Sequence, residues 1–309
     1  MPKKQVYHYC VCGLLVQSDT ELPELAATTK RQAQIRIKLS DATVPFENDP
    51  LHTKPFSKLN KSEFYFELPN VIRFLVRNGS EVLVEYLTYD TRFANEFIYS
   101  NALPMALLQR GIITFRASGI IDANDKVWLF FAAQRAGITS TAMFLMERGY
   151  RYFGDQIVSI RQDGSNVFTY PFGPTIHIWK PVLDKQTLFK PENIRPIREG
   201  LLKYSATIPK EKYDSSERQV QGLIEVEHLT KKFSHENIKM IDAFEILRNS
   251  IYLNHLTSHM GLESRIFGVL SQLVKQTKIM RVTRPKHKGS FHEFAEYLDL
   301  NIIGGGKND

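Results

Sequence analysis

The stretch "FFAAQRAGITSTAMFLMERGYRYFGDQIVSI", residues 130–160, decides the fold of this chain. It begins as an apolar strand and passes through a turn that contains Gly137. The following pattern predicts a helix from Thr139 to Arg148, which stops at Gly149. A second predicted strand, led by Asp155, follows. Strand, glycine turn and helix in this order have the layout of a phosphate-binding loop.

The turn itself matches such a loop only in part. A phosphate loop needs glycines that let backbone N–H groups surround the phosphates, a lysine for the outer phosphates, and a hydroxyl for Mg²⁺. In "AAQRAGITST", Ala132 replaces the first glycine and Ile138 replaces the lysine, whereas Gly137 and Thr139 are kept. The motif alone leaves two interpretations open, a nucleotide site and an ordinary strand-turn-helix packing unit.

The composition indicates a globular protein without membrane spans. The chain has 309 residues, 43% of them hydrophobic and 24% charged, which suits one large or two ordinary domains. Its longest apolar run, "VWLFFAA" at 127–133, is far shorter than the roughly 20 residues of a membrane helix. The N-terminus lacks the apolar segment of a secretion signal. We therefore expect a cytoplasmic protein.

The first 100 residues predict a β-rich domain with a mainly antiparallel sheet. Short runs rich in Val, Ile, Phe and Tyr predict strands at 5–16, 33–39, 63–68, 71–77 and 81–87. "NGS" at 78–80 predicts a hairpin turn. Residues 90–111 then have helical spacing, as one helix or as two short ones broken at Pro104.

Residues 101–300 predict a second domain, so that the whole chain is of the α+β or α/β class. The pattern predicts a loop-rich excursion at 181–222 and a disordered tail at 301–309. Strands are expected at 119–122, 126–132, 156–160, 175–179 and 278–284, a hairpin at 161–166, and C-terminal helices near 241–256, 262–275 and 290–299.

The flanking sequence resembles a known family. The segment "FRASGIIDANDKVWLFFAAQRAGITSTAMFLMERGYRYFGDQIVSI", from Phe115, resembles the HPr kinase/phosphorylase family, especially its divergent members in peptide-maturation or polysaccharide gene clusters. These show "LHASGV", a strand, "GxSGxGKST", a helix ending in "RGY" or "RGW", and "SDDVVAI". "HYCVCGLLVQSDTELPEL" at 8–25 and "NVFTYPFGPTIHIW" at 166–179 extend the similarity. It implies a P-loop domain of the HPr-kinase-like, PEP-carboxykinase-like type.

The resemblance also implies roles for the residues that match the family motif. Gly137, Thr139 and Ser140 would bind a nucleotide, and Thr139 would also bind Mg²⁺. Asp155 would take a proton from the attacking hydroxyl or help to hold the metal. The implied cofactors are ATP and Mg²⁺, and the implied acceptor is a Ser or Thr hydroxyl of a peptide or small protein.

Besides Ala132, four further positions depart from the family pattern. Arg116 stands where the family has the His of "HAS", Ile138 where it has the loop lysine, and Gln156 where it has a second Asp; Arg135 replaces the third loop glycine. The two arginines are cations in or near the turn, and a guanidinium can grip phosphate with two hydrogen bonds. Arg135 is therefore a predicted nucleotide-binding residue and Arg116 a predicted catalytic residue.

Two classes of function remain open. The first is an atypical ATP- and Mg²⁺-dependent phosphotransferase of the kinase type. The second is a pseudokinase with a degenerate Walker A loop, which serves as a peptide- or protein-binding regulatory module. Either class implies a peptide or small-protein partner and no membrane, and a homo-oligomer is compatible with both.

Two further clusters attract attention. His255, His259 and Glu263 are spaced by four residues, which suits a metal site on one helix face, but Gly261 interrupts the helix and surface histidines are the alternative. Residues 275–288 carry six Lys or Arg and no acid. This run is either a binding surface for an acidic ligand or a solvated basic face. No aromatic residues interleave with it, so nucleic acid is not an expected partner.

Overall fold

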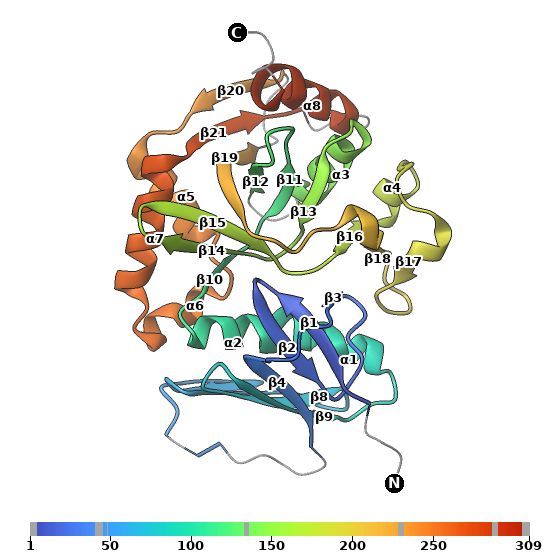
Figure 1. The fold of residues 1–309 in the computed structure, drawn as a ribbon, viewed down its shortest axis with the longest axis vertical. Helices are drawn as coiled ribbons and strands as arrows, with labels where there is room; N and C mark the ends of the chain where they lie inside the picture. Colours follow the sequence, from blue (N-terminus) through green and yellow to red (C-terminus); the bar gives the residue numbers. More distant parts are fainter. Residues whose placement is uncertain are drawn as a thin grey trace.

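The computed structural model describes residues 5–40, 46–47, 49–132, 136–227, 232–285 and 290–304. It contains two large sheets, with a helical segment between them and a small third sheet at the side (Figure 1). None of the helices in these ranges has the length and apolarity that a membrane crossing requires.

The N-terminal sheet is mostly antiparallel, as expected. Its strands lie in the order β3-β1-β2-β4-β9-β8-β7-β6-β5, and β4 is the exception because it runs parallel to both β2 and β9. Asn78 and Gly79 have φ values of 51° and 60°, the left-handed conformation that closes the predicted β8–β9 hairpin. The strands are β1 (Tyr7–Val11), β2 (Leu14–Ser18), β3 (Ala26–Ala27), β4 (Ile35–Leu39), β5 (His52–Lys54), β6 (Ser57–Leu59), β7 (Glu63–Leu68), β8 (Ile72–Arg77) and β9 (Glu81–Tyr86).

A continuous helical segment links the two large sheets. It consists of α1 (Thr91–Phe97), the π-helical η1 (Ile98–Ala102) and α2 (Leu103–Gln109). Pro104 lacks an N–H donor, and the carbonyl oxygen of Ser100, four residues earlier, accepts a hydrogen bond from the hydroxyl of Tyr252 instead. The segment therefore accommodates its proline without the break that the sequence suggested as one alternative.

The second sheet has a mixed topology that brings two loops to one edge. Its order is β10-β14-β15-β19-β12-β11-β13, with β21 and β20 continuing beside β19. Because β11 is antiparallel to both β12 and β13, those two strands run in the same direction and end at the same edge. The strands are β10 (Ile113–Phe115), β11 (Ser118–Ile121), β12 (Val127–Phe131), β13 (Arg151–Gly154), β14 (Val158–Asp163), β15 (Asn166–Pro171), β19 (Arg218–Glu227), β20 (Ser234–Asn237) and β21 (Lys278–Thr283).

The strand predicted to begin at Asp155 is placed differently. Asp155 follows the short strand β13 instead of leading the next one, and Gln156 has a left-handed φ of 65° that turns the chain toward β14. The helix before it, α3 (Ile138–Glu147), agrees with the predicted range within one residue. Asp155 therefore lies at the sheet edge where α3 begins.

The region predicted as a loop-rich excursion contains regular structure. Its strands β17 (Ile194–Pro196) and β18 (Lys203–Thr207) form a three-stranded sheet with β16 (Thr175–Trp179), and β19 begins inside it at Arg218. Figure 1 shows this small sheet projecting beside α4 (Lys180–Leu183). The same region also contains two 3₁₀ turns, η2 (Pro191–Asn193) and η3 (Lys210–Lys212).

The C-terminal part is helical apart from β20 and β21. The predicted helix at 241–256 is interrupted, since α5 ends at Asn249 and a short α6 follows. The last helix, η5, reaches Ile303 and so covers the first residues of the predicted tail, whereas residues 305–309 lie outside the described chain. The elements are α5 (Met240–Asn249), α6 (Asn254–Thr257), η4 (Ser258–Met260), α7 (Glu263–Gln276), α8 (Ser290–Leu298) and η5 (Asp299–Ile303).

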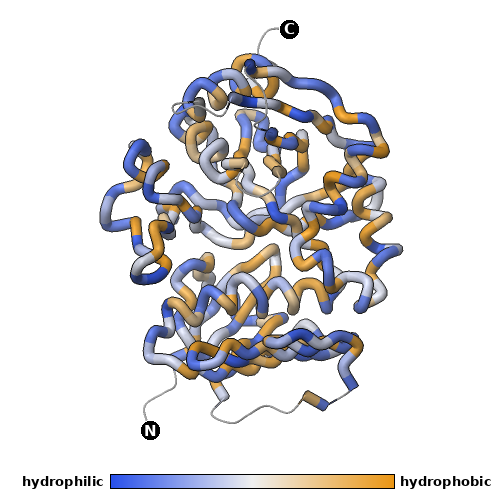
Figure 2. Tube along the Cα trace, turned by 180° about the vertical axis from the view of Figure 1, so that it is seen from behind, coloured by the Kyte–Doolittle hydropathy of each residue, from blue (hydrophilic) through white to orange (hydrophobic). Residues whose placement is uncertain are grey.

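Two hydrophobic cores stabilise this arrangement. The larger core is continuous from the N-terminal sheet through α2 to one face of the second sheet, and includes Phe74, Leu107 and Phe131. The smaller core lies on the opposite face, where Phe130 packs with α3 and α8. Figure 2 shows hydrophobic and hydrophilic residues alternating along the N-terminal strands, as expected for a sheet with one buried face. One core thus crosses the boundary predicted near residue 100.

Candidate functional site

The start of α3 is shaped by Gly137. This residue has a left-handed φ of 86°, and a Cβ atom there would lie 2.6 Å from the ring of Phe291 and 3.2 Å from Nη2 of Arg284. Conformation and close packing both require glycine at this position. Arg135, the predicted nucleotide-binding residue, falls in 133–135, outside the described residues.

Asp155 is a buried carboxylate that accepts four hydrogen bonds. Its side chain is at the end of β13, and the residue is 7% exposed. Oδ1 accepts from the hydroxyls of Ser118 and Thr139, the latter at 2.9 Å. Oδ2 accepts from the backbone N–H of His177 at 3.1 Å and from Nε2 of Gln156 at 3.3 Å. Four donors match the acceptor capacity of one carboxylate.

The structure thus brings Thr139 and Asp155 together from the ends of β12 and β13. A hydroxyl at the helix start and an aspartate from a nearby strand are the protein ligands that hold Mg²⁺ in P-loop enzymes. Both offer the oxygen atoms that Mg²⁺ prefers. Ser140 is buried in the same first turn of α3. The arrangement would hold Mg²⁺ at the start of α3 once the ion replaces one of the four donors on Asp155.

Arg284 is a residue of this site that the motif did not reveal. It follows β21, is 6% exposed, and donates from Nη2 to the carbonyl oxygen of Ala136 at 3.1 Å. Its guanidinium lies over the ring of Phe291, 4.0 Å from the centroid. Burial lowers the pKa of Arg284 below its usual value. In the sequence, Arg284 appears only as one residue of the basic run 275–288. Nothing in that run indicates that Arg284 contacts Ala136.

Arg116, the predicted catalytic residue, lies in a different environment. Its side chain is exposed, and the guanidinium lies 5.2 Å from the ring centroid of Tyr252. It lines a hollow that also contains Ser100 and His255. Within the described part of the chain it forms no hydrogen bond or ion pair with Asp155.

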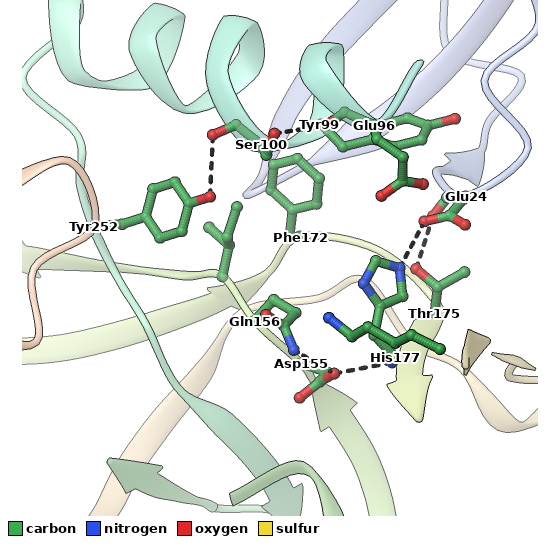
Figure 3. Close-up of a pocket in the computed structure, with 12 residues that line it drawn as sticks. Glu24, Glu96, Tyr99, Ser100, Asp155, Gln156, Phe172, Thr175, His177 and Tyr252 are labelled. Carbon is green, nitrogen blue, oxygen red and sulfur yellow. Dashed lines mark hydrogen bonds and ion pairs between the residues drawn. The ribbon is translucent and has the colours of Figure 1, made fainter. Parts of the chain in front are cut away.

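A cavity of about 180 Å³ lies on the other side of Asp155. The cavity lies between the N-terminal part and β16, and Figure 3 shows the side chains that line it. Its lining combines acids, cations and aromatic rings: Glu24, Glu96, Tyr99, Ser100, Asp155, Gln156, Ile157, Phe172, Thr175, His177, Lys203 and Tyr252.

The acids and the histidine of this cavity influence one another. Burial, reinforced by the charge of Glu24, raises the pKa of Glu96 to about 7. Burial acts to raise the pKa of Glu24, but the hydrogen bond and charge of His177, together with Ser205 and Lys203, outweigh it, so the pKa is lowered. For His177, burial acts to lower the pKa, but the hydrogen bond to Glu24 and the charges of Glu24 and Glu96 together raise it. His177 thus has an acidic partner, Glu24.

The predicted His255, His259 and Glu263 set is not a metal site in the described structure. His255 is on α6, His259 is in η4, and Gly261 with a φ of 68° separates them from α7. Glu263 accepts two hydrogen bonds of 2.9 Å from Arg248. These side chains do not form a group of ligand atoms close enough to share one ion.

The basic run at 275–288 is not a continuous free surface where it is described. Arg281 forms ion pairs with Glu225, Glu227 and Glu236. Arg284 is buried, as described above. Residues 286–288 lie outside the described chain. Arg281 and Arg284 therefore have structural contacts that the sequence could not show, whereas Lys275 and Lys278 are exposed.

Comparisons with known proteins give matches among solved structures. No family model and no curated protein matches the sequence. The structure is similar to the Hpr(Ser) kinase/phosphatase from Coxiella burnetii, with 12% sequence identity and a TM-score of 0.33, over 61% of this chain and 94% of that chain. That protein bears the name of the family that the sequence resembles. A match at this TM-score says nothing about function.

Proposed function

We propose that this chain is a divergent HPr-kinase-like phosphotransferase, which uses ATP and Mg²⁺ to phosphorylate a Ser or Thr hydroxyl of a peptide or small protein. The observation that supports this most directly is the pairing of Thr139 with Asp155 at the start of α3. A strand-turn-helix unit that only fills space has no need for a hydroxyl and a buried carboxylate at this point.

The residues present fit the magnesium ion better than they fit the phosphates. Thr139 and Asp155 offer two oxygen ligands for Mg²⁺. The first N–H groups of α3 have no side-chain cap and can face an anion. Ile138 contributes no charge at this position. Among the described residues, Arg284 brings a positive charge to the turn through its hydrogen bond to Ala136.

The proposed roles follow from these positions. Bound ATP would supply the phosphoryl group, with ADP as the leaving group, and the acceptor hydroxyl would lose its proton. Thr139 and Asp155 would hold Mg²⁺ through their side-chain oxygens, and Arg284 would oppose the negative charge that develops on the phosphoryl oxygens. Because Asp155 already accepts four hydrogen bonds, it serves as the proton acceptor only when one of these donors is released.

A second candidate is a pseudokinase that acts as a regulatory module. The observation that favours it is the ring of Phe291, which packs directly against Gly137 at the place where a loop would have to surround phosphate. Ile138 in the lysine position also favours the pseudokinase, because it cannot neutralise phosphate charge. In this case the cavity and surface would bind a peptide or protein without catalysis.

Thermal unfolding with nucleotide separates the two candidates. Ligand at a hundredfold excess over its Kd stabilises a protein by about 2.7 kcal/mol. The phosphotransferase should unfold at a higher temperature with ATP plus Mg²⁺ than with either alone, and should hydrolyse ATP slowly without an acceptor. A Mg²⁺-dependent shift without any hydrolysis supports the pseudokinase. No shift at millimolar ATP with Mg²⁺ contradicts the phosphotransferase.

A further inference from the structure

The cavity beside Asp155 contains a group of side chains that the proposed phosphotransfer does not use. Glu24 comes from the loop between β2 and β3, Glu96 from α1, and His177 from β16. Figure 3 shows the two carboxylates and the imidazole pointing toward one another across the cavity. They come from three distant chain segments and meet where the N-terminal part faces β16 of the small third sheet.

Their spacing is close to that of a coordination shell. One ligand atom from each residue lies within 4.8 Å of those of the other two. Nε2 of His177 and Oε2 of Glu24 are 3.1 Å apart. Ligand atoms about 2.0–2.2 Å from a common metal lie roughly 3–3.5 Å from their neighbours, so a small movement of Glu96 would complete the shell.

The state of Glu96 is the second observation. Glu24 is held by His177, but the carboxylate of Glu96 accepts no hydrogen bond from any described residue. Two carboxylates in a half-buried cavity repel each other, and burial strengthens that repulsion. The side chains of His177 and Glu24 are only 16% and 18% exposed, so water screens the group poorly. Lys203 also lines the cavity and offsets part of the negative charge, and a cation bound between the two carboxylates would relieve the remaining repulsion.

We propose that Glu24, Glu96 and His177 bind one divalent transition-metal ion of the Zn²⁺ or Mn²⁺ class. Imidazole favours such ions over Ca²⁺ and Mg²⁺, and two carboxylates supply charge neutralisation and hard oxygen ligands. The neutral imidazole binds through Nε2, which exchanges its hydrogen bond with Glu24 for the metal. The ion joins α1 and the β2–β3 loop to β16 and so ties the two halves of the molecule together.

The test uses the full chain, treated with EDTA and dialysed. ZnCl₂ or MnCl₂ is then added, metal content is measured by mass spectrometry after desalting, and thermal unfolding is recorded. We expect one ion per chain and a higher unfolding temperature, with MgCl₂ and CaCl₂ at equal concentration giving a smaller rise. Absence of bound Zn²⁺ and Mn²⁺ at 100-fold molar excess, or an equal response to all four ions, overturns the proposal.

Variants locate the ion. Glu96→Gln should weaken metal binding at least about tenfold without unfolding the protein, because its carboxylate forms no hydrogen bond within the described chain. Glu245→Gln, on the exposed face of α5, is the matched control and should bind as wild type does. Thr139→Val removes a ligand of the proposed Mg²⁺ site and should retain Zn²⁺. If Glu96→Gln binds metal as tightly as wild type, the site is not this one.

Discussion

The hydroxyl of Thr139 lies 2.9 Å from a carboxylate oxygen of Asp155, which is 16 positions further along the chain. The contact joins the first turn of α3 to the end of β13, and the two strands that carry these ends run in the same direction. Sheet topology therefore builds the proposed magnesium site, because neither residue reaches the other through local structure.

Replacing Asp155 tests both its structural and its metal-binding role. Asp155→Asn exchanges one acceptor oxygen for a donor that faces hydrogen-bond donors, so we expect a loss of about 1–3 kcal/mol in the free energy of unfolding. The Mg²⁺-dependent part of the ATP thermal shift should disappear. Urea denaturation and thermal unfolding measure the two effects. Asp163→Asn, at the exposed end of β14, is the control, and unchanged Mg²⁺ dependence in Asp155→Asn would exclude the proposed metal role.

A pair of substitutions at Thr139 isolates its hydroxyl. Thr139→Val keeps the shape but removes the oxygen, and should weaken binding of ATP with Mg²⁺ by about tenfold or more, which corresponds to about 1.4 kcal/mol. Thr139→Ser keeps the hydroxyl and should bind nearly as tightly as wild type. Calorimetry with and without Mg²⁺ provides the measurement. Equal affinities for the two variants would show that the hydroxyl does not hold the metal.

The sequence allowed the position of α3 and most of the strands to be predicted, because these have clear periodicity. It did not allow β13 to be predicted: four residues without alternation form a strand only through pairing with β11. Nor did it allow the strands inside 181–222 to be recognised, since β18 is held by β16 and not by local pattern. Propensity is a weak signal wherever tertiary pairing decides.

The candidate site likewise contains residues that the sequence indicated and residues that it did not. Gly137, Thr139 and Asp155 lie inside one motif and could be named from it. Arg284 donates to Ala136 from 148 positions away, and His177 meets Glu24 from 153 positions away. Such contacts depend on the packing of whole sheets and leave no spacing in the sequence.

Gly137→Ala should destabilise the protein through both its conformation and its neighbours. A left-handed residue with a Cβ costs about 1–2 kcal/mol, and the new atom would lie 2.6 Å from the ring of Phe291. Combining it with Phe291→Ala should relieve the clash, so the combined loss should be smaller than the sum of the single losses. Chemical denaturation of the four proteins gives this coupling energy. If the losses of the two single variants simply add in the double variant, the ring of Phe291 does not clash with an alanine side chain at position 137.

Arg284→Met tests whether this buried cation replaces the missing lysine. The substitution keeps much of the side-chain length but leaves the carbonyl oxygen of Ala136 without this donor, so we expect a loss of about 1–3 kcal/mol in the free energy of unfolding. At a temperature where the variant is still folded, we expect its ATP affinity to be lower by about tenfold or more. Arg284→Lys should recover part of the affinity because it restores the charge. Calorimetric titration with unchanged affinity in Arg284→Met would remove this residue from the proposed mechanism.

Glu96 predicts a characteristic pH dependence of stability in the EDTA-treated protein. Its pKa is raised from 4.5 to about 7 by burial and by the charge of Glu24, while His177 and Lys203 act in the opposite direction. Between these values the folded protein binds more protons than the unfolded chain, so the free energy of unfolding contributed by Glu96 falls as pH rises from about 4.5 to about 7. At 1.36 kcal/mol for each pKa unit, the fall is at most roughly 3 kcal/mol. Glu96→Gln should lack it, so the variant becomes more stable relative to wild type across this range. Urea denaturation at closely spaced pH values measures the difference, and parallel curves for the two proteins would show that Glu96 does not titrate in this range.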